Sequence, residues 1–271
     1  MRSILEASQS PNNWFITLTY DNDHLPISKY LNEETGVYTE TPTLDNVEEM
    51  KKFWKRFRIN LSRSSDVDLK VRYLYSGEYG DTTHRPHFHA ILFNTVLPDL
   101  KVFYKDKQTG FTYYTSELLE KSWKKGNVLI ADCTFETCQY VAAYVVKKQT
   151  GKQSQVYDDV NIIPPYMQMS RRPGIGSQVI ELNLETFWHD KSIILSTKNG
   201  GKQLPFDQYI KNKLDKQFGE EYQEYKNQLC EDMKELQELK YGSLEKTYLQ
   251  ALLDEEANFK ANYFKNKSRK L

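Results

Sequence analysis

The 271-residue sequence predicts an α+β fold, with a central antiparallel sheet of about five strands flanked by helices and followed by a C-terminal helical extension. Short runs of alternating aromatic and β-branched residues are typical of strands, and hydrophobic residues recur at helical spacing between them. The expected order is β-α-β-β-α-β-α. After residue 200 the composition becomes rich in Lys, Glu, Gln, Leu and Tyr. We therefore expect a folded domain at 1–200 and a helical extension at 201–271.

The first four elements follow from these patterns. Residues 14–20 (WFITLTY) alternate as a strand does. Asp45 and Glu48 have the spacing of a capping box, which predicts a helix over 45–63 with one face packed inward. Residues 70–79 and 87–93 are two further strands, and the short polar loop between them predicts an antiparallel hairpin.

The later elements of the domain are shorter. Residues 101–114 form a smaller hairpin, and residues 116–125 form an amphipathic helix ended by Gly126. Residues 127–133 are a fourth core strand. Thr134 then caps a helix that runs to about residue 148.

The remaining segments are less regular. Residues 151–176 have little periodicity, whereas residues 205–271 indicate two or three helices that end in a basic tail at 265–270. No apolar run approaches the ~20 residues of a membrane span, and the N-terminus lacks the layout of a signal peptide. The three cysteines have no paired zinc spacing. They indicate small buried thiols in a reducing cytosol, so we expect a soluble cytosolic protein with no membrane partner.

The charge of the chain is balanced, with 37 basic and 37 acidic residues. A neutral chain has no broad positive field to attract nucleic acid, so DNA affinity would have to come from local basic patches and a metal. From the second of two such patches we predict DNA contacts by Lys148, Arg171 and Arg172. A solvated helix face or loop explains either patch equally well. The patches comprise Lys51, Lys52, Lys55, Arg56, Arg58 and Arg63, and then Lys147, Lys148, Lys152, Arg171 and Arg172.

A metal site is predicted where two strands meet. His87 and His89 alternate in an apolar strand, so their imidazoles share one face. The hairpin brings Glu78 roughly opposite them, which completes a set of ligands suited to Mg²⁺ or Mn²⁺ bound together with a phosphate. By itself, a His-x-His pattern is more often two ordinary histidines. Glu78 could also pair with Arg85, and His84 could be a loop residue or a substitute ligand.

A nucleophile is predicted in the last core helix. Tyr140 and Tyr144 are one turn apart on one face, and Lys147 follows near the end of the helix. A phenol with a pKa near 10 attacks poorly unless a nearby cation favours the phenolate, as a metal-polarised phosphate and a lysine would. A tyrosine pair at this spacing is, on its own, usually a buried stripe.

The ordered set of these features resembles the three motifs of HUH endonucleases. More narrowly, it resembles the two-tyrosine rolling-circle replication initiators (Rep) of microviruses, and two further segments resemble the gokushovirus branch. The resemblance covers roughly residues 10–180 and does not reach 205–271. The motifs are Phe15 to Tyr20, Glu78 with Arg85 to Ala90, and Tyr140, Tyr144 and Lys147; the two further segments are Gly77 to Gly80 and Ser170 to Gly176.

The resemblance implies a fold and a set of roles. The fold is the RRM-like or ferredoxin-like HUH endonuclease sheet, with the histidine strand central and the tyrosine helix packed beside it. The implied metal ligands are His87 and His89, with Glu78 as the third. Tyr140, Tyr144 and Lys147 are the implied catalytic residues. Ala143 departs from the family pattern, where a basic residue is frequent, and this leaves open whether Lys148 takes over a phosphate contact.

The implied function is replication initiation in the cytoplasm of a bacterial host. One tyrosine nicks single-stranded DNA at a phage origin or hairpin, which leaves a 5′-phosphotyrosine and a free 3′-hydroxyl for a host DNA polymerase. The second tyrosine attacks the regenerated origin, and the ends rejoin as a circle. A host helicase would unwind the duplex, since no nucleotide-binding loop is present. Two alternatives remain: a non-catalytic origin-binding protein on the same fold, and a hydrolase whose metal activates water.

Overall fold

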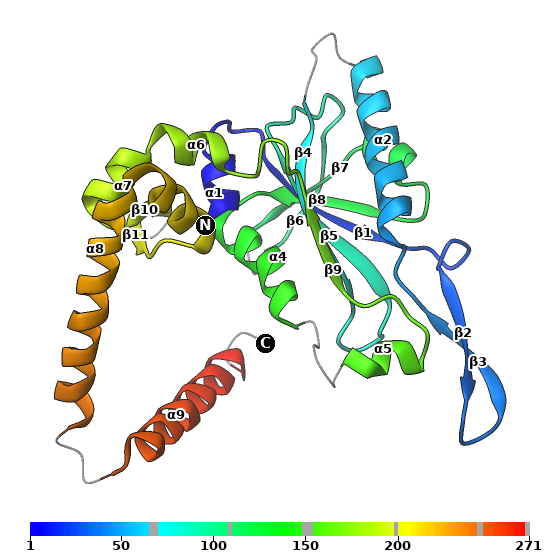
Figure 1. Cartoon of the computed structure of the whole chain (residues 1–271). Helices are drawn as coiled ribbons and strands as arrows, with labels where there is room; N and C mark the ends of the chain where they lie inside the picture. Colours follow the sequence, from blue (N-terminus) through cyan, green and yellow to red (C-terminus); the bar gives the residue numbers. More distant parts are fainter. Residues whose placement is uncertain (65–69, 108–109, 148–153, 198–199, 243–245, 269–271) are drawn as a thin grey trace. The chain divides into compact units, whose positions relative to one another are not determined.

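The structure is a computed structural model, and it divides the chain into two compact units, Met1–Pro205 and Phe206–Leu271 (Figure 1). Each unit is described by itself. The described residues are 1–64, 70–107, 110–147, 154–197, 200–242 and 246–268.

The first unit is built on an antiparallel sheet with the strand order β6-β7-β8-β1-β5-β4-β9. The core strands β1, β4, β5 and β8 occupy the predicted segments, which confirms the α+β plan. The sheet has seven strands where about five were expected, because the edge hairpin β6–β7 joins it and β9 extends it on the other side. The strands are β1 Trp14–Thr19, β4 Arg72–Tyr79, β5 Pro86–Phe93, β6 Lys101–Lys105, β7 Thr112–Thr115, β8 Val128–Asp132 and β9 Tyr166–Met169.

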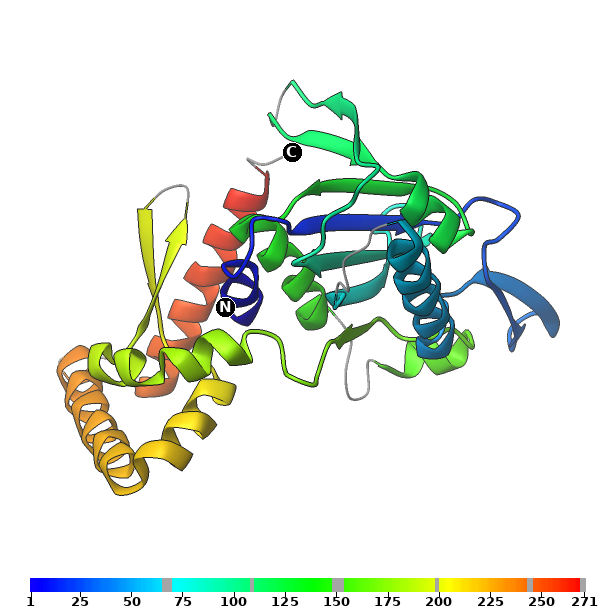
Figure 2. The ribbon, with the colours of Figure 1, turned by 90° about the horizontal axis from the view of Figure 1, so that it is seen from above.

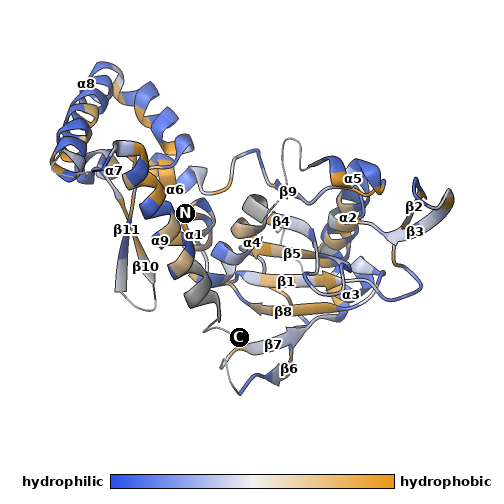
Figure 3. Ribbon diagram, turned by 90° about the horizontal axis from the view of Figure 1, so that it is seen from below, coloured by the Kyte–Doolittle hydropathy of each residue, from blue (hydrophilic) through white to orange (hydrophobic). Residues whose placement is uncertain are grey.

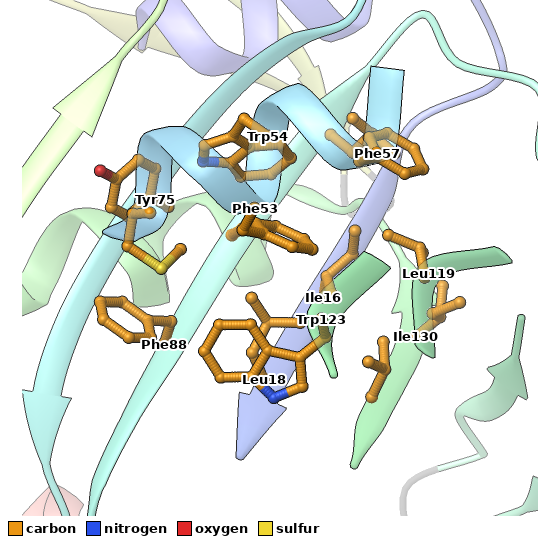
Figure 4. Packing of buried hydrophobic residues seen from close by; sticks show 14 of the residues in the cluster. Ile16, Leu18, Phe53, Trp54, Phe57, Tyr75, Phe88, Leu119, Trp123 and Ile130 are labelled. Atoms are coloured by element: carbon orange, nitrogen blue, oxygen red, sulfur yellow. The ribbon is translucent and has the colours of Figure 1, made fainter. Parts of the chain in front are cut away.

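One face of the sheet packs on α2 (Val47–Ser64) and α3 (Glu117–Trp123). Figure 4 shows Phe88 of β5 meeting aromatic rings from both helices, among them Phe53 and Trp123, and these side chains are fully buried. Aromatic side chains of this size contribute most of the burial in a core. This face therefore holds the main core of the unit.

The opposite face packs on α1 (Arg2–Ala7) and α4 (Phe135–Lys147), which lie across the sheet from α2 in Figures 1 and 2. Its core is smaller. It consists of Leu74, Ile91, Phe93, Cys138, Val141 and Ile175. Because this second core is small, part of the sheet face beside α4 is available for polar side chains.

Several short elements were not predicted from the sequence. The hairpin β2–β3 and the hairpin β10–β11 each form a separate two-stranded sheet. The bounds are β2 Ile27–Asn32, β3 Val37–Pro42, α5 Gln155–Asp159, α6 Ser177–Leu182, α7 Leu184–Asp190, β10 Ile193–Thr197 and β11 Gly200–Leu204.

Two predicted helix ends are wrong. Asp45 does not cap α2; Asn46 does, with its Oδ1 accepting from the backbone N–H of Glu49 at 3.0 Å. Asp45 is buried and accepts instead from the Tyr20 hydroxyl at 2.8 Å and from Lys125 at 2.7 Å. Helix α3 ends at Lys124, which has a left-handed φ of 61°, two residues before Gly126.

The predicted cap at Thr134 is confirmed, since its hydroxyl accepts from the backbone N–H of Thr137 at 3.2 Å. The cysteines follow the prediction in part. Cys138 is buried and its Sγ lies 3.5 Å from that of half-buried Cys133, whereas Cys230 is exposed. Both sulfurs of the pair lie at the start of α4.

The second unit contains α8 (Gln208–Tyr241) and α9 (Tyr248–Ser268), which agrees with the prediction of two or three helices. Gly219 interrupts α8 with a φ of 44° and a ψ of −110°. Hydrophobic residues concentrate on the central strands, whereas α8 is largely hydrophilic (Figure 3). Within the described part of the chain, no helix has the length and hydrophobicity that a bilayer span requires.

Candidate metal centre and tyrosine

The two histidines lie on β5, the central strand, and Glu78 lies on the neighbouring β4. Their strands pair so that Glu78 is directly opposite His87, while His89 is opposite Thr17 of β1. Since side chains alternate along a strand, all three ligating groups project to the α4 face of the sheet. The predicted approach of Glu78 to the histidines is confirmed.

The distances fit a shared metal ion. Oε1 of Glu78 lies 2.8 Å from Nε2 of His87 and 3.2 Å from Nε2 of His89, and the three ligand atoms all lie within 4.8 Å of one another. Adjacent ligands of an octahedral ion with bonds of about 2.1 Å are about 3 Å apart. Two nitrogens and one carboxylate oxygen at these separations could therefore hold a divalent ion and leave coordination positions open.

Hydrogen bonds behind the two rings orient them. Nδ1 of His87 lies 3.1 Å from the carbonyl oxygen of Arg85, which can only accept, so Nδ1 carries the proton and Nε2 is the ligand atom in the neutral ring. Nδ1 of His89 lies 3.1 Å from Oγ1 of Thr17. Such partners fix the tautomer and direction of metal-binding imidazoles. The donor set and its supports fit a metal ion.

The three groups are shielded to different degrees. The side chains of His89 and Glu78 are 8% and 10% exposed, and that of His87 is 19% exposed. Burial opposes a charge on His87, but the hydrogen bonds to Glu78 and to the Arg85 carbonyl outweigh it and raise the pKa of His87 above its ordinary value. A cation at this position is thus favoured by the carboxylate, whether it is a proton or a metal.

Tyr140 is the predicted nucleophile that the structure places at this cluster. It lies on α4, and its ring meets that of His89 edge-on with centroids 5.1 Å apart. Phe15 of β1 stacks on His89 at 5.4 Å and also meets Tyr140 edge-on at 6.0 Å. Tyr140 is 47% exposed, so its ring is held against the metal face while solvent can reach it.

The other predicted members of the tyrosine motif are described less fully. The backbone of α4 is helical through Tyr144 and Lys147, so Tyr144 lies one turn beyond Tyr140. Their side chains lie outside the described residues, as does the whole of Lys148.

Buried tyrosines elsewhere in the unit have a different role. Tyr20, Tyr75 and Tyr166 lie in the core on the α2 face, and burial raises the pKa of each well above its ordinary value. A carboxylate neighbour, Asp45, adds to the rise in the pKa of Tyr20. These phenols stay protonated and serve packing and hydrogen bonding.

Arg171 and Arg172 do not approach the metal cluster. They are exposed and follow β9, where the N–H of Ser170 donates to the carbonyl of Tyr73 at the start of β4. Glu78 lies five residues further along that strand, which corresponds to about 17 Å. Periodicity could not show this, because β9 is short and its partner strand is distant in the sequence.

The alternatives for the neighbouring residues are also resolved in part. The guanidinium of Arg85 donates to the carbonyl of Tyr20 at 2.9 Å. His84 is exposed in the turn between β4 and β5, has a φ of 49°, and is not one of the three grouped ligands. Sequence reasoning missed the buried pair of Glu6 and Arg72, through which α1 holds the segment around Gly174.

The fold and the cluster define an α+β protein whose central antiparallel sheet carries a His-His-Glu group that could hold a metal ion beside a tyrosine helix. The family model of the phage replication-associated protein ORF2 matches residues 13–149, which include both motifs, and the chain belongs to this family.

Three relatives are replication-associated proteins of phages. ORF2 of Spiroplasma virus 4 is 31% identical over 224 residues, which is 82% of this chain and 64% of the relative. VP4 of Bdellovibrio phage phiMH2K is 28% identical over 88% of this chain and 69% of the relative. ORF4 of Chlamydia phage 1 is 28% identical over 94% of this chain and 59% of the relative. The chain thus spans about three fifths to two thirds of these relatives, and no solved structure matches it.

Proposed function

We propose that this chain initiates phage DNA replication as a metal-dependent enzyme that nicks and rejoins single-stranded DNA through a phosphotyrosine intermediate. The observation that carries the proposal is the contact between the Tyr140 and His89 rings, 5.1 Å apart, beside a cluster of three potential ligands. Membership of a family of replication-associated proteins supports a role in phage replication.

His87, His89 and Glu78 would hold a Mg²⁺ or Mn²⁺ ion. When bound, the ion would act as a Lewis acid on the scissile phosphodiester and favour the phenolate of an attacking tyrosine. The residues behind the cluster, Thr17 and the Arg85 carbonyl, keep both imidazoles aimed at one point.

The chemistry is a transesterification. The phenolic oxygen of Tyr140 or Tyr144 attacks the phosphorus and loses its proton to solvent, forming a phosphorus–oxygen bond to tyrosine. The bond to the 3′-oxygen breaks, and that oxygen takes up a proton to become the free 3′-hydroxyl. One ester bond replaces another, so no ATP is consumed. Lys147, at the end of the same helix, would balance the charge of the phosphate.

Two tyrosines allow two rounds of attack. After a host DNA polymerase has extended the 3′-end, the second tyrosine cleaves the regenerated origin. The released 3′-hydroxyl then attacks the first phosphotyrosine and closes a circle. We propose that a host helicase opens the duplex, because the sequence contains no phosphate-binding loop of a motor. The reaction would take place in the cytoplasm of the bacterial host.

The proposal is tested by adduct formation. The protein is incubated with Mn²⁺ and a labelled single strand that carries the phage origin, and the products are separated on a denaturing gel. We expect a covalent protein–DNA species that needs both Mn²⁺ and the histidines. Tyr140→Phe and Tyr144→Phe should each change the adduct, and the double variant should form none.

Tyr104→Phe is the matched control, because Tyr104 is exposed on β6 at the far edge of the sheet. Absence of cleavage by the unmodified protein would favour an origin-binding protein without catalysis. Cleavage without an adduct would favour a hydrolase, and an adduct that survives in the double variant would refute the assignment of the nucleophiles.

A further inference from the structure

A groove lined by basic residues lies beside the start of β4, between α2 and the segment that follows β9. Its volume is about 1120 Å³. We call it the basic groove. It is lined by Val47, Lys51, Arg58, Lys70, Val71, Arg72, Tyr73, Gln168, Met169, Ser170, Arg171 and Arg172.

The basic groove combines parts of two patches that are far apart in the sequence. Lys51 and Arg58 come from α2, Lys70 precedes β4, and Arg171 and Arg172 follow β9; all five are exposed. Lys51 pairs with Glu48 at 2.6 Å. For the other four, no ion pair is found within the described chain, which leaves out residues 65–69.

The charge of this groove is not a general property of α2. A second groove, of about 760 Å³, lies along another side of the same helix and is lined by Arg56 and Arg63. Its lining also includes Asp99 and Glu117, whose carboxylates offset the cations. The lining residues of the basic groove include no carboxylate. A cationic surface of this kind fits a polyanion.

The segment that carries the two arginines is held in place. Ser170 bonds to Tyr73 through both its N–H and its hydroxyl, at 2.9 and 3.1 Å. Arg72 is buried against Glu6 and donates to the carbonyls of Pro173 and Gly174 at 3.0 and 3.1 Å. A surface whose backbone is already ordered loses little conformational freedom when a ligand binds.

The lining favours phosphates over bases. Tyr73 is the one aromatic residue that lines the groove, and both faces of its ring are covered, by Trp54 at 4.1 Å and by the Arg58 guanidinium at 5.5 Å. Single strands are bound by basic grooves that also offer free aromatic faces for stacking. Duplex DNA offers its phosphates to cations without any stacking partner.

We propose that the basic groove binds the phosphate backbone of duplex DNA. It lies at the start of β4 and on the side of α2, whereas the metal cluster lies near the end of β4 on the α4 face. The two surfaces therefore receive different segments of DNA. The inference rests on the proposed function only in taking this duplex to be the one that adjoins the cleaved strand.

The test measures binding of a fluorescein-labelled duplex of two helical turns by anisotropy at several salt concentrations, without divalent metal. Each cation–phosphate contact adds about 0.9 to the slope of log affinity against log salt. We expect the slope to fall by roughly 2.7 when three groove arginines are neutralised. The groove variant is Arg58→Gln, Arg171→Gln and Arg172→Gln.

A second groove variant, Lys51→Gln with Lys70→Gln, should lower the slope by roughly 1.8 and guards against a folding defect in the first. The matched control removes the same charge from other sides of α2 and should leave the slope unchanged. The control is Lys52→Gln, Lys55→Gln and Arg63→Gln.

Three results would overturn the proposal: an unchanged slope in both groove variants, an equal loss in the control, or a loss for a single strand of the same length as large as that for the duplex. Because the measurement needs no metal and no cleavage, it can succeed or fail independently of the adduct experiment on the proposed function.

Discussion

Thr17 shows how a residue that does not touch a metal can control its site. Its hydroxyl oxygen lies 3.1 Å from Nδ1 of His89, and the backbone pairs it directly opposite that histidine. This contact leaves Nε2 of His89 directed at Glu78. His87 obtains the same support from the Arg85 carbonyl, which no side-chain substitution removes. The orientation of His89 is therefore the part of the cluster that a single substitution can test.

We expect Thr17→Val to weaken Mn²⁺ binding by about 10- to 100-fold, because valine keeps the shape of threonine but loses the hydrogen bond that fixes the imidazole. Isothermal titration calorimetry with Mn²⁺ measures this change. Thr19→Val is the control, since Thr19 lies on the same strand opposite His87 but its hydroxyl donates to the Asn127 carbonyl. Equal affinities for both variants would show that Thr17 does not position His89.

At the scale of elements, the hairpin of β4 and β5 presses a core ring against a strand that lacks a side chain. A Cβ on Gly77 would lie 2.6 Å from Cε1 of Phe88 and 3.0 Å from Cδ2 of Leu44. Phe88 is fully buried between His87 and His89 in the sequence, so its ring has no room to move. The glycine lets the ring of Phe88 pack against the sheet directly below the metal ligands.

We expect Gly77→Ala to lower the free energy of unfolding by about 1–3 kcal/mol, the range for overpacking a well-filled core. Urea denaturation followed by circular dichroism measures it. Gly80→Ala, in the same short motif, should change stability by less than about 0.5 kcal/mol. There the new Cβ would come no closer than 3.4 Å to Thr83. A loss at position 80 as large as that at 77 would contradict the packing argument.

The predictability of these elements depended on how local their determinants are. Strand alternation sufficed to place Glu78 opposite His87, because the two strands are joined by a short loop. Strand β9 was missed, since four half-buried residues pair with β4 across a long stretch of chain. For the same reason the sequence placed Arg171 among the groups near the tyrosine helix, whereas the structure places it beside α2. Asp45 had the spacing of a cap, but burial with Lys125 determined its role.

At the scale of the whole molecule, charge is arranged locally. The 37 basic and 37 acidic residues cancel, so long-range attraction to DNA is weak. The metal cluster and the basic groove are instead small regions in which one kind of charge is concentrated. Both belong to the unit Met1–Pro205, as do the two hydrophobic clusters that support the sheet. The unit Phe206–Leu271 contributes to neither.

This division leads to an expectation for a shortened chain. Every described residue of the metal cluster, and every residue that packs or hydrogen-bonds behind it, precedes Pro205. We therefore expect a protein ending at Pro205 to unfold cooperatively and to bind Mn²⁺ within about twofold of the full chain, since a single ligand set determines the affinity. Calorimetry on both proteins measures the affinity, and thermal unfolding checks the fold. If the shortened protein folds but loses Mn²⁺ affinity, residues after 205 take part in the metal site. If it does not fold, the boundary between the two units does not separate independent domains.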